Sequence, residues 1–199
     1  SCSTGSAGSS QVDEQAIMRH VEKMVGFGPH PPGTEAQRKV GDYLIEQLKS
    51  HGLQTSTQEF EAVTPIGRLN MRNVWGVLPG PSNKVIILAS HYDSKYFEEF
   101  RFVGANDGGS SSAILLELAR ILSGRNPTGY SVWFVFFDGE EALQEWTDLD
   151  SLYGSRQFVR MLQTRQQLRE VAALILLDLV GEEDLVFRKD VNSSPWLVD

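Results

Sequence analysis

Two adjacent carboxylates, Glu140 and Glu141, stand just after the apolar residues 132–137. That run has the length and composition of a buried strand. A strand that ends in an acidic turn places both carboxylates at the carboxyl edge of a sheet, where open α/β sheets bind ligands. Neighbouring carboxylates repel each other, so such a pair is typical of a site in which one binds a metal ion and the other carries a proton.

Imidazole and acidic side chains follow two further predicted strands. The apolar run 84–89 leads to His91 and Asp93, and the apolar run 172–177 ends in Asp178. Because the carboxyl ends of parallel strands meet at one edge of a sheet, we expect these side chains to lie near the Glu-Glu pair.

Asp107 lies in a glycine-flanked loop at the entrance of a predicted helix. Residues 113–122 have helical spacing, serines precede them, and Gly124 is a stop signal. Three strand ends and one helix entrance would then bring together one imidazole and five carboxylates, namely His91, Asp93, Asp107, Glu140, Glu141 and Asp178. Such an oxygen and nitrogen set suits a divalent metal ion, and zinc accepts it.

Four of these residues also have purely structural explanations. His91 could be a hydrogen-bonded core histidine, and Asp93 could cap the turn that follows it. Asp107 could be the N-cap of the helix after it. Asp178 could close its strand in an Asx turn. Acidic residues at three strand ends would then be a coincidence, so the set as a whole favours a functional site.

Hydrophobic periodicity predicts the elements that position these side chains. Amphipathic spacing predicts helices over residues 13–25 and 34–49. Alternation predicts a hairpin of strands 53–62 and 69–78, which leads into a strand over residues 85–89. Strand-helix units follow. We therefore expect an α/β fold in three layers, with a mixed, centrally parallel, twisted sheet and helices on both faces.

Four segments together resemble a known family, and they occur in this order: His91-Tyr92-Asp93-Ser94, Gly104-Ala105-Asn106-Asp107, Glu140-Glu141 and Asp178. In order and spacing they resemble the zinc-dependent aminopeptidase superfamily, which includes the glutaminyl-peptide cyclotransferases. Further segments resemble the cyclotransferase branch: residues 91–97, residues 137–142 with Trp146, residues 150–156 and residues 176–181. The resemblance covers about residues 13–185, nearly the whole chain.

The resemblance implies a zinc aminopeptidase-like fold and a role for each matching residue. Asp107 and Glu141 would bind zinc, and Glu140 would be the general acid/base. Asp178 would be a second carboxylate that assists proton transfer, and Trp146 would help wall the substrate pocket. Asp93 is expected to contact the metal-binding residues and orient them without binding the metal itself.

The implied activity is a zinc-dependent glutaminyl-peptide cyclotransferase, which converts an N-terminal glutamine to pyroglutamate and releases ammonia. Its partners would be peptides or proteins with a free N-terminal glutamine, and it would hold one zinc ion. An alternative is a dinuclear aminopeptidase, in which His91 and Asp178 hold a second zinc and Asp107 bridges the two. A third is a binding domain of the same fold without catalysis, which the presence of both glutamates argues against.

Two features depart from the cyclotransferase pattern. Residues 106–111 are closer to the peptidase version of this loop than to that of the animal cyclases. The family's last zinc ligand is a histidine far downstream of Asp178, and no histidine follows Asp178 here. Residues 186–190 read as a short strand, and residues 192–195 are a helix-start signature. We therefore expect the natural protein to continue and the zinc site of this chain to be incomplete.

Composition agrees with one enzyme domain over residues 13–199. The 199 residues are 41% hydrophobic and carry a net charge of -8, from 18 basic and 26 acidic residues. There is no run of lysine or arginine, which argues against nucleic acid as a partner. No apolar stretch approaches the length of a membrane span.

The N-terminal residues 1–12 are rich in serine and glycine and predict a flexible tether. Cys2 is the only cysteine, so no disulfide forms within the chain. A cysteine at the start of such a tether resembles the lipidated cysteine of a bacterial lipoprotein. An incidental cysteine is the alternative. We expect an exported protein, periplasmic or anchored to a membrane through Cys2.

Overall fold

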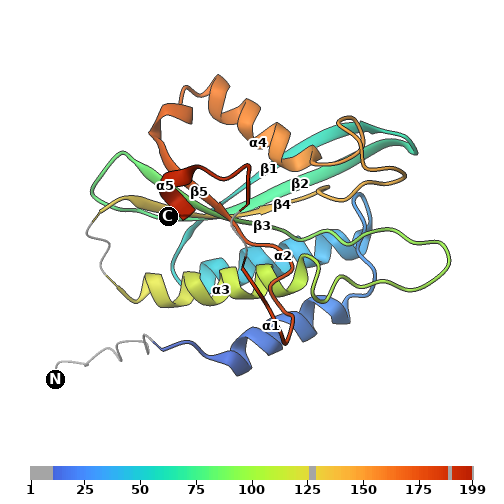
Figure 1. The fold of residues 1–199 in the computed structure, drawn as a ribbon, viewed down its shortest axis with the longest axis horizontal. Helices are drawn as coiled ribbons and strands as arrows, with labels where there is room; N and C mark the ends of the chain where they lie inside the picture. Colours follow the sequence, from blue (N-terminus) through green and yellow to red (C-terminus); the bar gives the residue numbers. More distant parts are fainter. Residues whose placement is uncertain (1–10, 126–128, 188–189, 199) are drawn as a thin grey trace.

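The computed structural model describes residues 11–125, 129–187 and 190–198 and contains the predicted mixed sheet (Figure 1). Strands β1 (Gln54–Thr64) and β2 (Gly67–Leu78) form the antiparallel hairpin, and β2 pairs antiparallel with β4 (Ser131–Phe137). Strands β3 (Val85–His91) and β5 (Val171–Leu176) continue the sheet parallel to β4, in the order β1-β2-β4-β3-β5. The predicted mixed sheet with a parallel part is confirmed.

Helices cover both faces of the sheet (Figure 1). On one face lie α1 (Glu14–Gly26), α2 (Glu35–Ser50) and α3 (Gly109–Ser123), and on the other lies α4 (Tyr153–Thr164). A short 3₁₀ helix (Leu168–Glu170) precedes β5, and α5 (Pro195–Val198) comes last.

Side-chain caps fix where the first two helices begin. The side chain of Asp13 accepts a hydrogen bond from the Ala16 amide, and that of Thr34 accepts one from the Gln37 amide. Such caps satisfy amides that have no partner within the helix. The predicted helices 13–25 and 34–49 are confirmed to within about one residue at each end.

Strand β4 is buried on both faces, as its unbroken apolar run requires. Phe134 and Phe136 pack against the layer of α1, α2 and α3. Val135 and Phe137 point the other way and pack against Phe158 of α4. The end of this strand, where the Glu-Glu pair follows, is therefore held rigidly between two core clusters.

The C-terminal strand prediction is wrong where it can be checked. Residues 186, 187 and 190 lie in no strand, and residues 188 and 189 lie outside the described residues. A strand needs a hydrogen-bonding partner, and the described part of the chain pairs none with this segment. The helix predicted to start near residues 192–195 does begin, at Pro195.

The predicted tether and its Cys2 anchor fall mostly on residues 1–10, which lie outside the described residues. Within the described ranges, no helix has the length and apolar character needed to cross a membrane.

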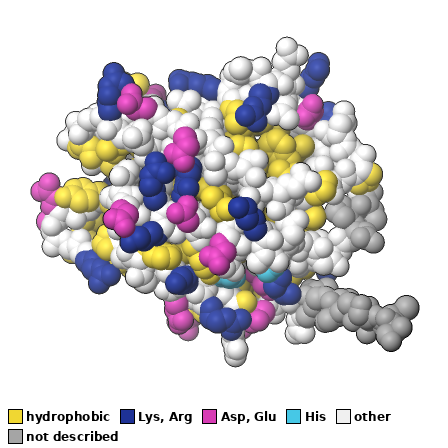
Figure 2. Space-filling view, turned by 180° about the vertical axis from the view of Figure 1, so that it is seen from behind, with side chains coloured by type: hydrophobic (Ala, Val, Ile, Leu, Met, Phe, Trp, Pro, Cys, Tyr) yellow, Lys and Arg dark blue, Asp and Glu magenta, His cyan; other side chains and the backbone are white. Residues whose placement is uncertain are grey.

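Acidic and basic side chains are interspersed over the face seen in Figure 2. Nucleic-acid binding depends on a concentrated field of positive charge. This face presents no such field.

Phe158 offers a test of the α4 packing. It is buried and lies edge-on to Trp75, Phe137 and Trp133, with ring centroids 5.5, 5.6 and 6.3 Å away. Phe158→Ala is expected to lower the free energy of unfolding by about 3–5 kcal/mol, because it leaves a cavity among these rings. Urea denaturation measures the change. Val159→Ala, at a neighbouring position that is 42% exposed, is the control and should lose less than about 1 kcal/mol. A loss below about 1 kcal/mol for Phe158→Ala would contradict this packing.

Candidate metal and acid/base site

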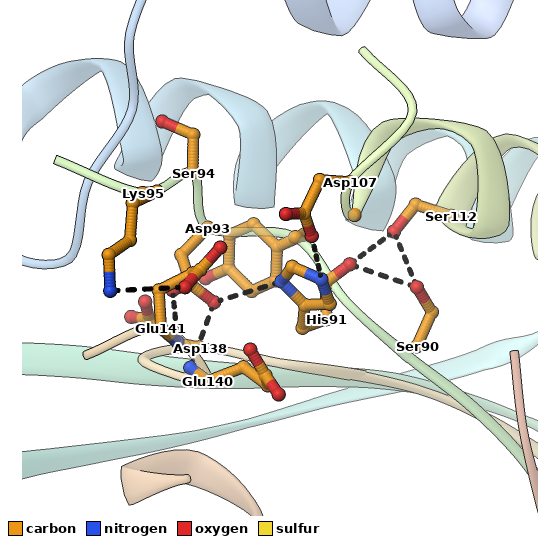
Figure 3. Close-up of polar contacts among 12 residues, drawn as sticks. Ser90, His91, Asp93, Ser94, Lys95, Asp107, Ser112, Asp138, Glu140 and Glu141 are labelled. Carbon is orange, nitrogen blue, oxygen red and sulfur yellow. Dashed lines mark hydrogen bonds and ion pairs between the residues drawn. The ribbon is translucent and has the colours of Figure 1, made fainter. Parts of the chain in front are cut away.

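Three strand ends meet at one edge of the sheet, as the sequence predicts. In the parallel register, His91 of β3 lies beside Phe137 of β4, directly before the Asp138–Glu141 turn. On its other side β3 pairs with β5, whose chain continues to Asp178. The loop before α3 supplies Asp107, whose carboxylate reaches back to the imidazole of His91 (Figure 3).

His91 is buried among three carboxylates. Its Nε2 atom lies 3.1 Å from Asp107 Oδ1 and 3.4 Å from Asp178 Oδ1, and its Nδ1 atom lies 3.6 Å from Asp93 Oδ1. Burial lowers the pKa of His91, but these carboxylates outweigh burial and raise that pKa well above its ordinary value. The hydrogen bond with His91 in turn lowers the pKa of Asp107.

Asp93 fixes the backbone of the Glu-Glu turn. Its carboxylate is fully buried and accepts hydrogen bonds from the Glu140 amide at 3.0 Å and the Glu141 amide at 3.1 Å. Asp93 therefore does not simply cap its own turn. It joins the end of β3 to the turn after β4, behind the side chains that face the site.

Both glutamates have carboxyl groups that titrate near neutral pH. Burial raises the pKa of Glu140 to about 7, and the charge on Asp93 adds to the effect. Burial also raises the pKa of Glu141 to about 7, with further increments from the charges on Asp107 and Asp93. The positive charge of Lys95 lowers the pKa of Glu141. Its ammonium lies 3.5 Å from Glu141 Oε2 (Figure 3).

Asp107 is not the N-cap of α3. That position belongs to Gly108, which has a φ of 76° and no side chain. A Cβ atom at Gly108 would lie 2.9 Å from His91 Cε1, so only glycine lets the loop approach the imidazole this closely. The Asp107 carboxylate is left free to face the site.

A buried polar layer beneath the site was not predicted from the sequence. Asp138 accepts hydrogen bonds from the Gln37 side chain and the Arg72 amide, both at 2.6 Å. Gln37 also donates to the Tyr92 hydroxyl. Burial raises the pKa of Asp138 well above its ordinary value. Its position directly after β4 was the available signal, whereas nothing in the helical pattern distinguished Gln37.

Trp146 is the predicted site residue that the structure does not bring to the cluster. Its side chain is 58% exposed, and it lines neither of the two cavities that border the site. Its role in a substrate pocket stays a prediction. Tyr96 and Phe97, in contrast, do line one of these cavities.

The residues at this edge fit a divalent cation. One ligand atom from each of His91, Asp107 and Asp178 lies within 4.8 Å of the others. The carboxylate of Glu141 lies close enough to Asp107 for a hydrogen bond between the two to affect the pKa of Asp107. A cation here would offset the mutual repulsion of these carboxylates, and an imidazole with carboxylates is a donor set that zinc accepts.

Comparison with known proteins identifies the family of this chain. Residues 73–196 match the family described as Peptidase family M28. The chain belongs to peptidase family M28. This family is zinc-dependent, which agrees with the donor set described above.

Relatives of this M28 chain include glutaminyl cyclases. A glutaminyl-peptide cyclotransferase of Drosophila melanogaster is 33% identical over 174 residues, which are 84% of this chain and 49% of the relative. A crystal structure of an Acidobacteriales bacterium glutaminyl cyclase is 35% identical with a TM-score of 0.89, and the match covers 100% of this chain and 69% of that one. These matches confirm the predicted zinc aminopeptidase-like fold and the predicted resemblance.

A further structural relative has a different description. A leucine aminopeptidase precursor from Bacteroides thetaiotaomicron is 28% identical with a TM-score of 0.78, and the match covers 89% of this chain and 66% of that one. The chain spans about half the length of the curated relatives it matches, 49% in the Drosophila case.

The raised pKa values of Glu140 and Glu141 predict that the metal-free chain loses stability as pH rises. Folding raises each pKa from 4.5 to about 7, so the folded state binds more protons than the unfolded state in that window. The free energy of unfolding therefore falls as pH increases through it. Allowing for the partial exposure of Glu140 and for the repulsion that the two carboxyl groups share with Asp107 and Asp93, we expect a fall on the order of 1–3 kcal/mol.

Urea denaturation at pH 5 and pH 8 with a chelator measures this loss. The double variant Glu140→Gln, Glu141→Gln should reduce the pH dependence and leave the part that comes from the raised pKa values of His91 and Asp138. Glu145→Gln, at an exposed position in the same loop, should leave the pH dependence unchanged. The same pH dependence in the wild type and the double variant would show that these two carboxyls are not its source.

Proposed function

We propose that this chain carries the catalytic edge of a zinc-dependent glutaminyl-peptide cyclotransferase, which acts on peptides with an N-terminal glutamine. The observation that carries the proposal is the pair of half-buried Glu140 and buried Glu141, whose pKa values of about 7 suit proton transfer beside a cation site. The similarity to glutaminyl cyclases from Drosophila melanogaster and an Acidobacteriales bacterium supports it.

Asp107 and Glu141 would hold one zinc ion in this proposal. The mutual influence of their carboxyl groups supports the pairing, since the charge on Asp107 contributes to the raised pKa of Glu141. When bound, the ion supplies Lewis-acid polarisation of a substrate carbonyl. His91 would not bind the zinc ion. Its Nε2 atom already contacts the carboxylates of Asp107 and Asp178 and would remain their hydrogen-bond partner.

Glu140 would carry the proton during cyclisation. The α-amine of the substrate attacks the carbon of its own γ-carboxamide, and a new C–N bond forms. Glu140 accepts a proton from that amine and returns one to the departing nitrogen, so the old C–N bond breaks and ammonia leaves. The nucleophile belongs to the substrate itself, which makes attack intramolecular and favours it by proximity.

Asp178 would assist at the leaving group. Its side chain is 38% exposed and lies beside His91, so it can contact a bound substrate from the open side. Because His91 shares its Nε2 atom between Asp178 and Asp107, the imidazole orients both carboxylates. Asp93 would act from behind, through the backbone of the Glu-Glu turn.

An aminopeptidase is the second candidate, and one observation favours it. Ligand atoms of His91, Asp107 and Asp178 lie within 4.8 Å of each other, which suits a second metal ion. The likeness to a leucine aminopeptidase precursor agrees with that arrangement. Glu140 would then activate water for attack on a peptide bond next to a free N-terminus.

We also propose that the protein is exported and held at a membrane by lipidation of Cys2. What supports this is the serine- and glycine-rich composition around Cys2.

Two glutamine substitutions in the full-length protein test the assigned roles. Glu140→Gln is expected to keep zinc but lose roughly a hundredfold or more in turnover, because an amide cannot accept the proton. Glu141→Gln is expected to lose zinc, because a carboxylate ligand becomes an amide. Metal analysis beside an ammonia-release assay measures both effects, with Glu145→Gln as the control. Wild-type zinc content and turnover in both variants would disprove the assignment.

A comparison of substrates separates the two candidate activities. We expect ammonia and pyroglutamate from a glutaminyl peptide, little cleavage of leucyl or alanyl anilides, and about one zinc per chain in the active protein. Two tightly held zinc ions together with anilide cleavage would instead identify an aminopeptidase.

A further inference from the structure

A second cavity lies next to the candidate site and takes no part in the proposed chemistry. It has a volume of about 580 Å³ and is walled mainly by proline, aromatic and aliphatic side chains. Its walls come from four separate parts of the chain: the loop between α1 and α2, the end of the β1–β2 hairpin, residues 95–102, and Leu143. In Figure 1 the loop that contains residues 95–102 projects beyond the sheet at the right-hand end.

Lys95 lies between the cavity and the candidate site. This side chain lines the cavity, donates a hydrogen bond to the carbonyl of Ala142 at 2.7 Å, and lies 3.5 Å from the carboxylate of Glu141. Figure 3 shows its amine pointing towards Glu141. Leu143, another wall residue, follows Glu141 by only two positions. The cavity therefore begins one side chain away from the acidic pair.

Hydrogen bonds hold the walls close to the site. His30 and Ser94 exchange two of them: the His30 amide donates to Ser94 Oγ at 2.9 Å, and the Ser94 amide donates to the His30 carbonyl at 3.2 Å. These bonds tie the loop between α1 and α2 to the residue directly after Asp93. At the wall residue Leu143, the backbone amide donates a hydrogen bond to the carboxylate of Asp150 at 2.9 Å.

Aromatic side chains of the cavity face solvent although they are large and apolar. Phe97 is 37% exposed and Phe100 is 54% exposed, and their rings stack with centroids 4.4 Å apart. Phe102 meets Phe97 edge-on at 5.4 Å. Covering a solvent-exposed aromatic ring with another apolar side chain lowers the free energy, because apolar surface is removed from water.

One unpaired cation also lines the cavity. The side chain of Arg101 is exposed and forms no hydrogen bond or ion pair with any other described residue. Glu98 and Glu99, in the same loop, do not line the cavity. A carboxylate at this position would therefore meet a free guanidinium.

We propose that this cavity binds the residues that follow the N-terminal residue of a peptide substrate, with an aromatic side chain against Phe97 and Phe100 and a carboxylate against Arg101. The proposal rests on the proposed function, because it assigns the rest of the peptide whose N-terminus reaches Glu140. An extended peptide advances about 3.3 Å per residue, so its second to fourth residues pass from the acidic pair, past Lys95, into the cavity.

The experiment uses glutaminyl tetrapeptide amides with alanine at the other positions, and with phenylalanine at position two, three or four in turn. We expect one phenylalanine peptide to have a kcat/KM for ammonia release about tenfold or more above the all-alanine peptide, since a large apolar side chain leaves water. Phe97→Ala and Phe100→Ala should each remove most of this preference and leave turnover of the all-alanine peptide unchanged. Tyr130→Ala, which removes an exposed aromatic ring at the opposite end of β4, should change neither value.

Arg101 is tested with a glutamate or a glutamine placed directly after the preferred phenylalanine. The glutamate peptide should be favoured by about threefold at low salt, and both Arg101→Gln and high salt should abolish the difference. An unchanged glutamate preference in Arg101→Gln would remove Arg101 from the proposal.

Isothermal titration of the same peptides separates this proposal from the proposed function. If ammonia is released but phenylalanine gives no advantage, or the advantage survives in both phenylalanine variants, the subsite is disproved and the cyclase activity stands. If the zinc-loaded, full-length protein releases ammonia from no peptide, the cyclase activity fails. The subsite still stands if the phenylalanine peptide binds about tenfold more tightly than the alanine peptide and Phe100→Ala removes that difference.

Discussion

Two hydrogen bonds from the amides of Glu140 and Glu141 to the buried carboxylate of Asp93 hold the site in its arrangement. They join the turn after β4 to the end of β3 and hold its two glutamates near Asp107 against the repulsion between the three carboxylates. Asp93 is charged as well, and it contributes to the raised pKa values of both glutamates. One carboxylate thus fixes the positions of the acidic pair and tunes its protonation.

The burial of so many carboxyl groups is tolerated because positive groups and a polar layer surround them. His91 meets three carboxylates, and Lys95 reaches Glu141 from the side of the neighbouring cavity. Beneath them, Asp138 receives hydrogen bonds from the Gln37 side chain and the Arg72 amide, which connects helix α2 and strand β2 to the turn. The turn is therefore supported from both layers, and its geometry depends on packing far from the acids themselves.

The sequence predicted elements and strand-end residues well because both follow local rules. The first two helices, to within about one residue at each end, and the unbroken run of β4 followed from spacing alone. The contact of Lys95 with Glu141 was not, because it depends on how two loops approach in space. The strand predicted over residues 186–190 failed for a related reason, since strand formation depends on a partner that a local pattern does not reveal.

The position of His91 bears directly on the two candidate chemistries. Its Nε2 atom already lies between Asp107 and Asp178, at 3.1 and 3.4 Å, and its raised pKa favours a proton on the ring. A second metal ion would need that same nitrogen as a neutral ligand and would have to displace the proton. In the proposed mononuclear chemistry His91 stays a hydrogen-bond partner of Asp107 and Asp178, and no proton has to leave the ring. The two candidate chemistries therefore place different demands on His91, which is a hydrogen-bond partner in one and a neutral ligand in the other.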